Sequence, residues 1–324
     1  MTIEKLPSGN YRIKEMHGGK MYSATLNHKP TKAEAQKIIQ SKLVGFNDNT
    51  TFEKAADAYI KSKLNILSPS TIRGYRAVLR NMDENFLKTP LDKITHPMLQ
   101  TLISNCAADH TPKTVRNVNG FIMSVLNFYG SNVKSARLPQ KEKKPVYIPT
   151  EDEIKAILSD AKGTKYEVAF ILGTMGLRRS EICALTKEDL NGNVLTIDKA
   201  LVQDENNEWV VKSTKTTDST RTIVVPDYVA ELIREKGVCE YGPHAIYAAL
   251  QRSQKRLGIQ SFPFHKLRHF FASYMHNSGY TDKQIQEFGG WKTDIIMKTV
   301  YQHAMDMDKV KNSMANQVGG LLGN

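Results

Sequence analysis

The chain has 324 residues, 40% of them hydrophobic, and carries a formal net charge of +12. This length suggests two or three domains of a soluble globular protein, and no apolar run approaches the roughly 20 residues that would cross a membrane or resembles a secretory signal. The three cysteines are far apart in sequence and in no ligand-like spacing, so we expect reduced thiols in a cytoplasmic protein with no structural zinc.

The N-terminal segment predicts a small basic module. Apolar residues alternate with polar ones on both sides of Gly18-Gly19, which predicts a β-hairpin over residues 10–27 because glycines can adopt the positive φ angles of a tight turn. Thr31 has an acidic residue three positions later, which is the spacing of a helix capping box. Residues 1–49 carry 8 basic and 4 acidic side chains. We expect a hairpin and one helix that form an appended module.

The next region, residues 50–135, predicts an all-helical domain of four or five helices. Apolar residues recur at helical spacing, and Ser68, Thr95 and Thr111 each stand just before a helix start that contains proline. Residues 50–145 carry 15 basic and 7 acidic side chains, which fits a solvated basic surface or a surface that binds a polyanion through counterion release. The candidates for contacts with a nucleic acid as the polyanion are Arg73, Arg76, Arg80, Lys113 and Arg116.

A charged stretch that ends in proline, residues 140–145, suits an exposed linker to a third region. That region, residues 146–324, carries 22 basic and 22 acidic side chains. It opens with a capping box at Thr150 and continues through a long apolar helix that ends at Gly176. Alternation of period two over 194–225 predicts short strands joined by polar turns. We predict a mostly helical domain with a small inserted antiparallel sheet.

Four segments of the third region concentrate reactive side chains. Each has an ordinary structural interpretation when it is taken alone: Arg178 with Glu181 is a buried ion pair, and Tyr301 is one of 13 tyrosines. Their combination and order point to chemistry instead. The segments are G-L-R-R-S-E at 176–181, a polar turn between two strands at 212–221 that contains Lys215, F-H-K-L-R-H at 264–269, and G-G-W at 289–291 followed by Tyr301.

The order G-L-R-x-S-E, a lysine in a β-turn, H-x-L-R-H, G-G-W and a late tyrosine resembles the signature of tyrosine recombinases of the phage integrase type. The resemblance covers essentially the whole chain and implies a multidomain α+β protein with the tyrosine recombinase catalytic fold. The small basic N-terminal module favours a mobile-element integrase over a chromosome-dimer resolvase. The implied parts are an arm-type DNA-binding domain at 1–47, a SAM-like, core-binding helical domain at 50–138, a linker at 139–147 and a catalytic domain at 148–324 with a tail at 302–324.

The resemblance and the chemistry of phosphodiesters together assign roles to the catalytic candidates. Tyr301 is the nucleophile. Arg178 and Arg268 form a clamp, because guanidiniums bind the non-bridging phosphate oxygens with bidentate geometry and stay charged at neutral pH. A tyrosine titrates near about 10 and needs a base or a positive field, and His265 is the candidate base or proton relay. Lys215 is our choice to protonate the leaving 5′ oxygen.

The remaining candidates support these groups. Lys212 is the alternative to Lys215, because the sequence does not fix the register of the strands. Trp291 stands where many family members have histidine, and an indole has one N–H donor that does not exchange protons as imidazole does, so we expect it to buttress the phosphate. His269 is an orienting partner or a structural residue, and Glu181 is the partner of Arg178. No carboxylate constellation suggests a metal, and the implied reaction needs no cofactor.

The implied reaction is a transesterification of DNA through a 3′-phosphotyrosine. We predict a site-specific integrase of a phage or of a conjugative or transposable element, which acts on double-stranded DNA at attachment sites in the cytoplasm, on the nucleoid. The resemblance implies a homotetramer on DNA in which residues 302–324 dock on a neighbouring protomer, with a DNA-bending host factor and an excision factor as further partners. The alternatives are a type IB-like topoisomerase and a catalytically silent sequence-specific DNA-binding protein.

Overall fold

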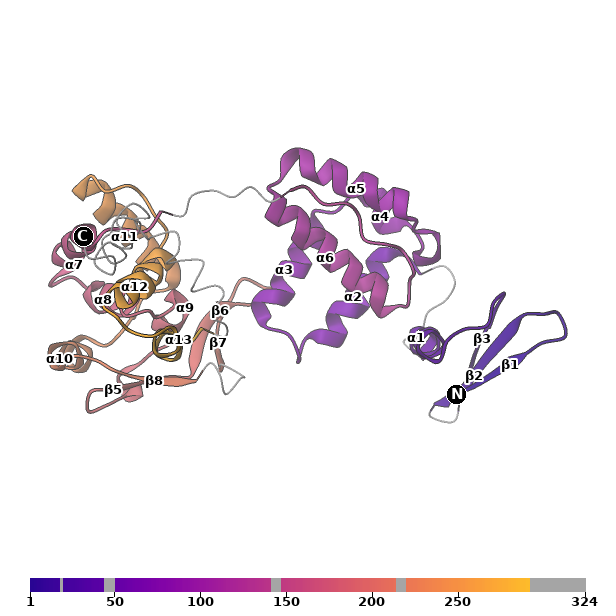
Figure 1. Cartoon of the computed structure of the whole chain (residues 1–324), viewed down its shortest axis with the longest axis horizontal. Helices are drawn as coiled ribbons and strands as arrows, with labels where there is room; N and C mark the ends of the chain where they lie inside the picture. The colour runs from indigo at the N-terminus through magenta and orange to yellow at the C-terminus, as the bar shows by residue number, and fades with distance from the viewer. Residues whose placement is uncertain (18–19, 44–49, 141–146, 214–219, 292–324) are drawn as a thin grey trace, which may run out of the picture. The chain divides into compact units, whose positions relative to one another are not determined.

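The chain forms two compact units in the computed structural model. One unit comprises Met1–Lys143 together with the loop Gln203–Glu208, and the other comprises Lys144–Val202 and the chain from Trp209 onward. Among the described residues, we find no helix with both the length and the apolar character that a bilayer crossing requires. The residues that the structure describes are 1–17, 20–43, 50–140, 147–213 and 220–291 (Figure 1).

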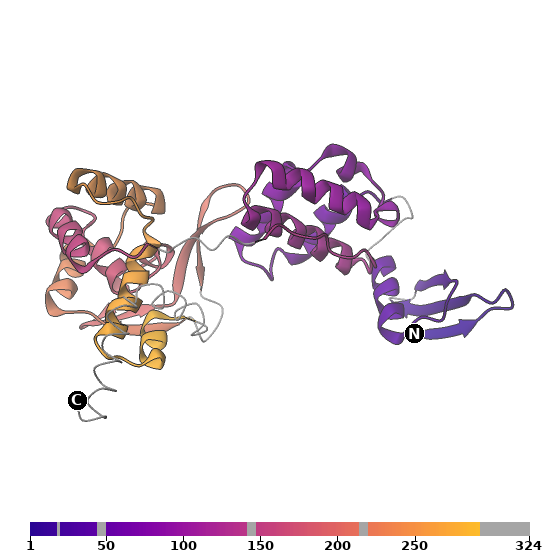
Figure 2. The ribbon, with the colours of Figure 1, turned by 45° about the horizontal axis from the view of Figure 1, so that its top comes forward.

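The first unit begins with an antiparallel sheet in the strand order β1-β2-β3. Fully buried Ile13 on the middle strand clusters with Ala35 and Ile39 of the helix that follows, so this helix covers one face of the sheet (Figure 2). The predicted hairpin and helix are confirmed, and a first strand is added that the alternation did not reveal. The elements are β1 (Thr2–Lys5), β2 (Tyr11–His17), β3 (Lys20–Leu26) and α1 (Lys32–Leu43).

The rest of the first unit is helical around one apolar core (Figure 1). The side chains of Thr95 and Thr111 accept backbone N–H groups in the first turns of the helices that they precede, so both are N-caps at the predicted positions. Ser68 occupies the N-cap position of α3, and the predicted all-helical region is confirmed. Its elements are α2 (Phe52–Lys63), α3 (Pro69–Arg80), α4 (Glu84–Lys88), a 3-10 turn (Leu91–Lys93), α5 (His96–Asp109) and α6 (Pro112–Phe128).

The second unit is mostly helical with a small antiparallel sheet, as predicted. The sheet has the order β4-β5-β8, and β6 pairs with β7 in a separate ribbon. The strands are β4 (Leu190–Asn191), β5 (Val194–Ile197), β6 (Lys199–Gln203), β7 (Trp209–Ser213) and β8 (Arg221–Val224). The helices are α7 (Glu151–Ala161), α8 (Glu167–Thr174), α9 (Arg179–Ile182), α10 (Asp227–Lys236), α11 (Pro243–Leu257), α12 (His265–Asn277) and α13 (Asp282–Gly289).

Helix α8 is central to the second unit, because seven consecutive residues around its surface are buried. Gly173 lets the segment that leads into α12 approach closely, since a Cβ at this position would lie 2.7 Å from the Phe264 ring. The chain leaves α8 through Gly176, whose φ of +91° favours glycine and where a Cβ would lie 2.8 Å from the Phe271 ring. This turn leads directly to Arg178, so packing against α12 fixes the place where Arg178 enters the next helix.

Candidate active site

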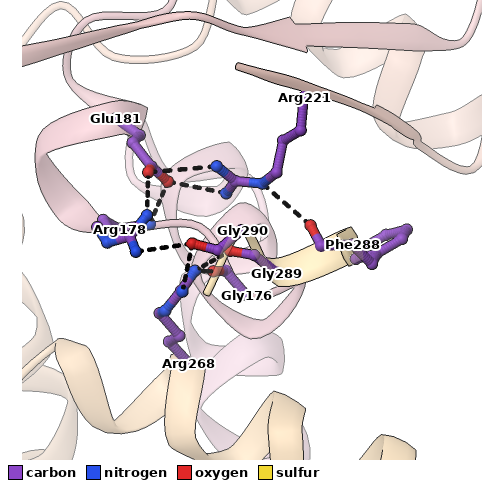
Figure 3. A network of polar contacts seen from close by, with 8 residues as sticks. All are labelled: Gly176, Arg178, Glu181, Arg221, Arg268, Phe288, Gly289 and Gly290. Carbon is purple, nitrogen blue, oxygen red and sulfur yellow. Dashed lines mark hydrogen bonds and ion pairs between the residues drawn. The ribbon is translucent and has the colours of Figure 1, made fainter. Parts of the chain in front are cut away.

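Arg178 lies at the start of α9, where it contacts Glu181 and the chain after α13 (Figure 3). Its Nη1 lies 2.5 Å from Glu181 Oε1, and its backbone N–H donates to Glu181 Oε2 over 2.8 Å. Its Nη2 donates to the carbonyl oxygen of Gly290 over 2.8 Å. These hydrogen bonds hold the guanidinium in one orientation. Because the side chain is 38% exposed, the guanidinium is still accessible to a ligand from solvent.

Arg268 lies on α12 and is only 1% exposed. Its Nη1 donates to the carbonyl oxygens of Gly176 and Gly289. Burial lowers the pKa of Arg268 and the charge of Arg178 acts in the same direction, but a guanidinium starts from so high a pKa that it keeps its proton at neutral pH. The second unit therefore holds a buried positive charge beside Arg178, as the predicted clamp requires.

Trp291 follows α13 and is 7% exposed. The guanidinium carbon of Arg268 lies 3.7 Å from the centre of its ring, a cation–π contact. The ring also stacks on Phe271, with ring centroids 6.2 Å apart and planes inclined by 10°. The sequence predicts that Trp291 buttresses the phosphate. In the structure Trp291 packs against Arg268, so any effect on a phosphate would come from the way in which the ring positions that guanidinium.

The C-terminal end of α13 receives hydrogen bonds from three arginines (Figure 3). Carbonyl groups at a helix C-terminus have no partner within the helix and carry partial negative charge, so guanidiniums both satisfy and neutralise them. Gly290 has a φ of +67°, and a Cβ on Gly289 would lie 1.8 Å from the Trp291 ring, which gives the G-G-W motif a packing reason. Arg221 donates to the carbonyl oxygen of Phe288, Arg268 to that of Gly289 and Arg178 to that of Gly290.

Arg221 is a residue of this site that the sequence pattern did not reveal. The predicted turn over 212–221 is too long at both ends, because residues 212 and 213 belong to β7 and Arg221 is the first residue of β8. Arg221 is 9% exposed. Its Nη2 lies 2.9 Å from Glu181 Oε2, its Nη1 3.3 Å from Oε1, and its Nε donates to the Phe288 carbonyl over 3.0 Å. Strand alternation is the missed signal, because Arg221 shares the buried face with Ile223 and Val225.

Glu181 is a buried carboxylate that two arginines share. Burial alone would raise the pKa of Glu181, but the hydrogen bond and charge of Arg221 and the charge of Arg178 more than offset this, so its pKa lies below the ordinary value. Glu181 is therefore ionised at neutral pH. We call Arg178, Glu181, Arg221 and Arg268 the arginine cluster. Its three positive and one negative side chains leave an excess of positive charge that can bind a phosphodiester.

His265 begins α12 and lines an open hollow of ≈ 420 Å³ together with Arg178. Burial, followed by the charges of Arg268 and Arg178, lowers the pKa of His265 to about 4. The imidazole is therefore neutral at pH 7 and able to accept a proton. His269 lies one turn further on, with its ring edge-to-face against that of His265 at a centroid distance of 5.0 Å. Burial lowers the pKa of His269 to about 3.

We expect the two histidines to make the protein lose stability in mild acid. Their folded pKa values of about 4 and about 3 lie below the ordinary 6.5, so the unfolded chain binds more protons as the pH falls from 6.5 towards 3. At pH 5.5 the loss is roughly 1 kcal/mol per histidine after allowance for partial exposure. Thermal unfolding of wild type and His269→Gln between pH 7.5 and 4.5 measures this, and the variant should show the shallower fall. Parallel curves would contradict the assignment.

Of the three remaining predicted groups, one lies in β7 and two belong to the segments after β7 and after α13. Lys212 is half-buried in β7. Lys215 and Tyr301, the predicted nucleophile, lie outside the described residues, as does the tail 302–324. The structure thus brings together Arg178, Glu181, His265, Arg268, His269 and Trp291 in one region of the second unit, and the roles of Lys215 and Tyr301 stay predictions.

The basic candidates of the first unit differ in their surroundings. Arg80 and Lys113 are exposed. Arg76 forms ion pairs with Asp57 and Glu205. In addition, Arg73 Nε donates to Asn207 Oδ1 over 2.8 Å, and Arg116 donates to the carbonyl oxygens of Pro112 and Pro139. Arg80 and Lys113 are therefore the more accessible candidates for contacts with DNA phosphates.

Two family models match the chain. Residues 149–307 match the model of the phage integrase family, and residues 51–106 match the model described as phage integrase, N-terminal SAM-like domain. The tyrosine recombinase XerA of Thermococcus kodakarensis is 26% identical over 264 residues, which cover 73% of this chain and 87% of the relative. The similarity thus extends over both the helical region of the first unit and the second unit.

Solved structures show the same fold. A Tn1549 transposon integrase in complex with transposon right end DNA matches with a TM-score of 0.66 at 17% identity, over 82% of this chain and 99% of that chain. A lambda integrase tetramer bound to a Holliday junction matches with a TM-score of 0.57 at 15% identity, over 92% of this chain and 94% of that chain. At these identities the likeness establishes the fold, and the chemistry follows from the residues of the site.

Proposed function

The chain belongs to the phage integrase family of tyrosine recombinases, and from this premise we propose that it is the integrase of a phage or of a conjugative or transposable element. As a tyrosine recombinase it is an enzyme that breaks and rejoins DNA. The observation that carries the proposed chemistry is the arginine cluster, which gathers positive charge around an accessible guanidinium in the unit that matches the family model. The small basic module formed by β1, β2, β3 and α1 favours a mobile element as the source.

In the proposed reaction, the guanidiniums of Arg178 and Arg268 bind the non-bridging oxygens of the scissile phosphate. The phenol oxygen of Tyr301 attacks phosphorus, the bond to the 5′ oxygen breaks, and a 3′-phosphotyrosine and a free 5′ hydroxyl result. Neutral His265 takes the phenol proton, directly or through water. A 5′ hydroxyl of a partner strand then attacks the phosphotyrosine and releases the enzyme. The covalent bond conserves the energy of the phosphodiester, so neither ATP nor a metal takes part.

The proton for the leaving 5′ oxygen comes from Lys215 in this proposal, with Lys212 as the alternative. Replacing Lys215 with alanine should slow cleavage about 10²–10⁴-fold. A substrate with sulfur in place of the bridging 5′ oxygen should restore the rate of that variant, because a thiol with a pKa of about 8.5 leaves without a proton. Lys212→Ala is the matched control. If the sulfur substrate restored the rate of Lys212→Ala instead, Lys212 would be the proton donor. If it restored the rate of neither variant, neither lysine would be the proton donor.

The first unit is the proposed DNA-binding part, with residues 1–47 on arm-type sites and residues 50–138 on the core sites. A relative of this fold is described as a tetramer on a Holliday junction, and we propose a homotetramer in which residues 302–324 dock on a neighbouring protomer. We also propose that the protein acts in the cytoplasm on attachment sites. A DNA-bending host factor and an excision factor are further proposed partners.

Deleting residues 302–324 should remove the slow tetramer band in a native gel and leave single-site binding intact. An unchanged tetramer band would exclude the docking.

The proposed function is tested with DNA from the borders of the element that encodes the protein, incubated in EDTA. The expected product is a protein–DNA adduct that survives detergent, carries the 3′ end of the cut strand and leaves a 5′ hydroxyl that a kinase can label. A plasmid without border sequences is the control, and its relaxation would favour a topoisomerase. Binding to the border DNA without any adduct, with host extract added, would favour a silent DNA-binding protein.

A further inference from the structure

We propose that Arg221 is a positioning residue of the arginine cluster, which shares the charge of Glu181 so that Arg178 stays available to the scissile phosphate, and which fixes the end of α13 to β8. The inference rests on the proposed function, because it concerns the same reaction. Arg221 itself is nearly inaccessible, with a side chain 7% exposed, so it acts through its partners and not on DNA directly.

Two guanidiniums share the carboxylate of Glu181. Both terminal nitrogens of Arg221 face the two oxygens of Glu181, at 2.9 and 3.3 Å. The same oxygens bind the side chain and the backbone N–H of Arg178. Without Arg221, the carboxylate would face Arg178 alone in a buried setting, where an ion pair is held tightly. The charge of Arg178 would then serve Glu181 and not the phosphate.

The charge of the arginine cluster suits the proposed reaction. Three guanidiniums and one carboxylate give the arginine cluster a formal charge of two positive units. A phosphodiester has one negative charge, and a second develops as the nucleophile adds to phosphorus. The arginine cluster therefore matches the charge of the transition state, and a cluster without Arg221 would match only that of the substrate. Charge that is placed in advance for the transition state is commonly the largest contribution to catalysis.

Arg221 also connects two segments of the second unit, β8 and α13. Its Nε donates to the carbonyl oxygen of Phe288 in the last turn of α13. The fit is close, since a Cβ on Gly290 would lie 2.8 Å from Arg221 Nη1. In sequence, β8 follows the stretch that contains Lys215, and α13 precedes Tyr301. One side chain thus ties together the two elements that neighbour the proposed proton donor and the proposed nucleophile.

The test is single-turnover cleavage of border DNA by wild type, Arg221→Met and Arg221→Lys. At saturating DNA, Arg221→Met should cleave about 10²-fold more slowly, with an unchanged half-saturating DNA concentration, because a misplacement of about 1 Å has a cost of this order. Arg221→Lys keeps the charge but not the fork and should lose about 10-fold. The matched control is Arg256→Met on α11, which removes an arginine bound through two nitrogens to Asp160 and should cleave as wild type.

A pH profile separates positioning from a role in stability alone. Arg221→Met leaves Glu181 buried with less opposing charge, so its pKa rises. The cleavage defect of Arg221→Met relative to wild type should therefore shrink towards low pH, because a protonated Glu181 no longer competes with the phosphate for the charge of Arg178. Arg221→Met combined with Glu181→Gln should lose this added pH dependence, because the amide does not titrate. A merely structural Arg221 would lower the melting temperature and leave the pH profile of the folded enzyme unchanged.

Three outcomes would overturn the inference. A wild-type cleavage rate per folded molecule of Arg221→Met, with an unaltered pH profile, would overturn the inference about Arg221 and leave the proposed function standing. If Arg221→Met does not fold, a wild-type rate for Arg221→Lys would have the same meaning. The absence of an adduct from wild-type protein would overturn the proposed function, and this inference with it.

Discussion

Tyr301→Phe is expected to form no covalent adduct with border DNA, with a loss of roughly 10⁴-fold or more in cleavage. The substitution removes one oxygen atom, the proposed nucleophile, and leaves the shape of the ring. DNA binding should therefore be unchanged in a gel-shift experiment run beside the cleavage assay. Tyr280→Phe is the matched control, since this tyrosine is 52% exposed, and it should form the adduct at the wild-type rate.

The position of the adduct gives this experiment a second readout. Proteolysis of the wild-type adduct, followed by mass spectrometry of the peptide that carries the nucleotide, should identify residue 301. An adduct on another tyrosine, or an adduct that persists in Tyr301→Phe, would show that the nucleophile is wrongly assigned. The family assignment would survive that result, because it rests on the family models and on the fold.

Arg178→Lys is the second substitution for which we expect a large effect, a loss of about 10²–10³-fold in cleavage. Lysine keeps the positive charge, but one ammonium group cannot bind Glu181, the Gly290 carbonyl and a phosphate oxygen in the fixed geometry of a guanidinium. The measurement is the single-turnover rate at saturating border DNA. Affinity for the DNA should change little, because most phosphate contacts are proposed for the first unit.

The control for Arg178→Lys is Arg234→Lys on α10. Arg234 also donates to a backbone carbonyl, that of Gly192, over 2.6 Å, but it is exposed and belongs to no part of the arginine cluster. It should cleave as wild type. If Arg178→Lys also cleaved at the wild-type rate, a fixed guanidinium would not be needed, and the clamp would reduce to a general positive field.

Helix starts and strand pairing were predictable where short-range chemistry decides them. Thr95, Thr111 and Thr150 cap helices as predicted, since a hydroxyl and the following backbone amides suffice to define an N-terminus. The hairpin over 10–27 was predictable because alternation continues on both sides of Gly18-Gly19. Strand β1 has four residues, too few for alternation to distinguish it from a loop.

The candidate site was predictable in its motifs and not in its connections. Arg178, His265 and Arg268 stand in recognisable motifs, but the partner of Glu181 comes from a strand that is distant in sequence, and pairing of that kind depends on tertiary structure. Polar neighbours concealed Arg221. A buried charge on a strand is rare enough that the alternation with Ile223 carried little weight without knowledge of the carboxylate that it meets.

The carbonyl oxygens at the end of α13 act as an internal ligand of the arginines. They take up Nη2 of Arg178 and Nη1 of Arg268, and so they orient the N–H groups that remain for the proposed phosphate. Thermodynamic linkage makes this support reciprocal, so a phosphate that binds the oriented guanidinium more tightly should strengthen the bond from Arg178 to Gly290 by the same factor. Binding of the proposed phosphate should therefore stiffen the end of α13.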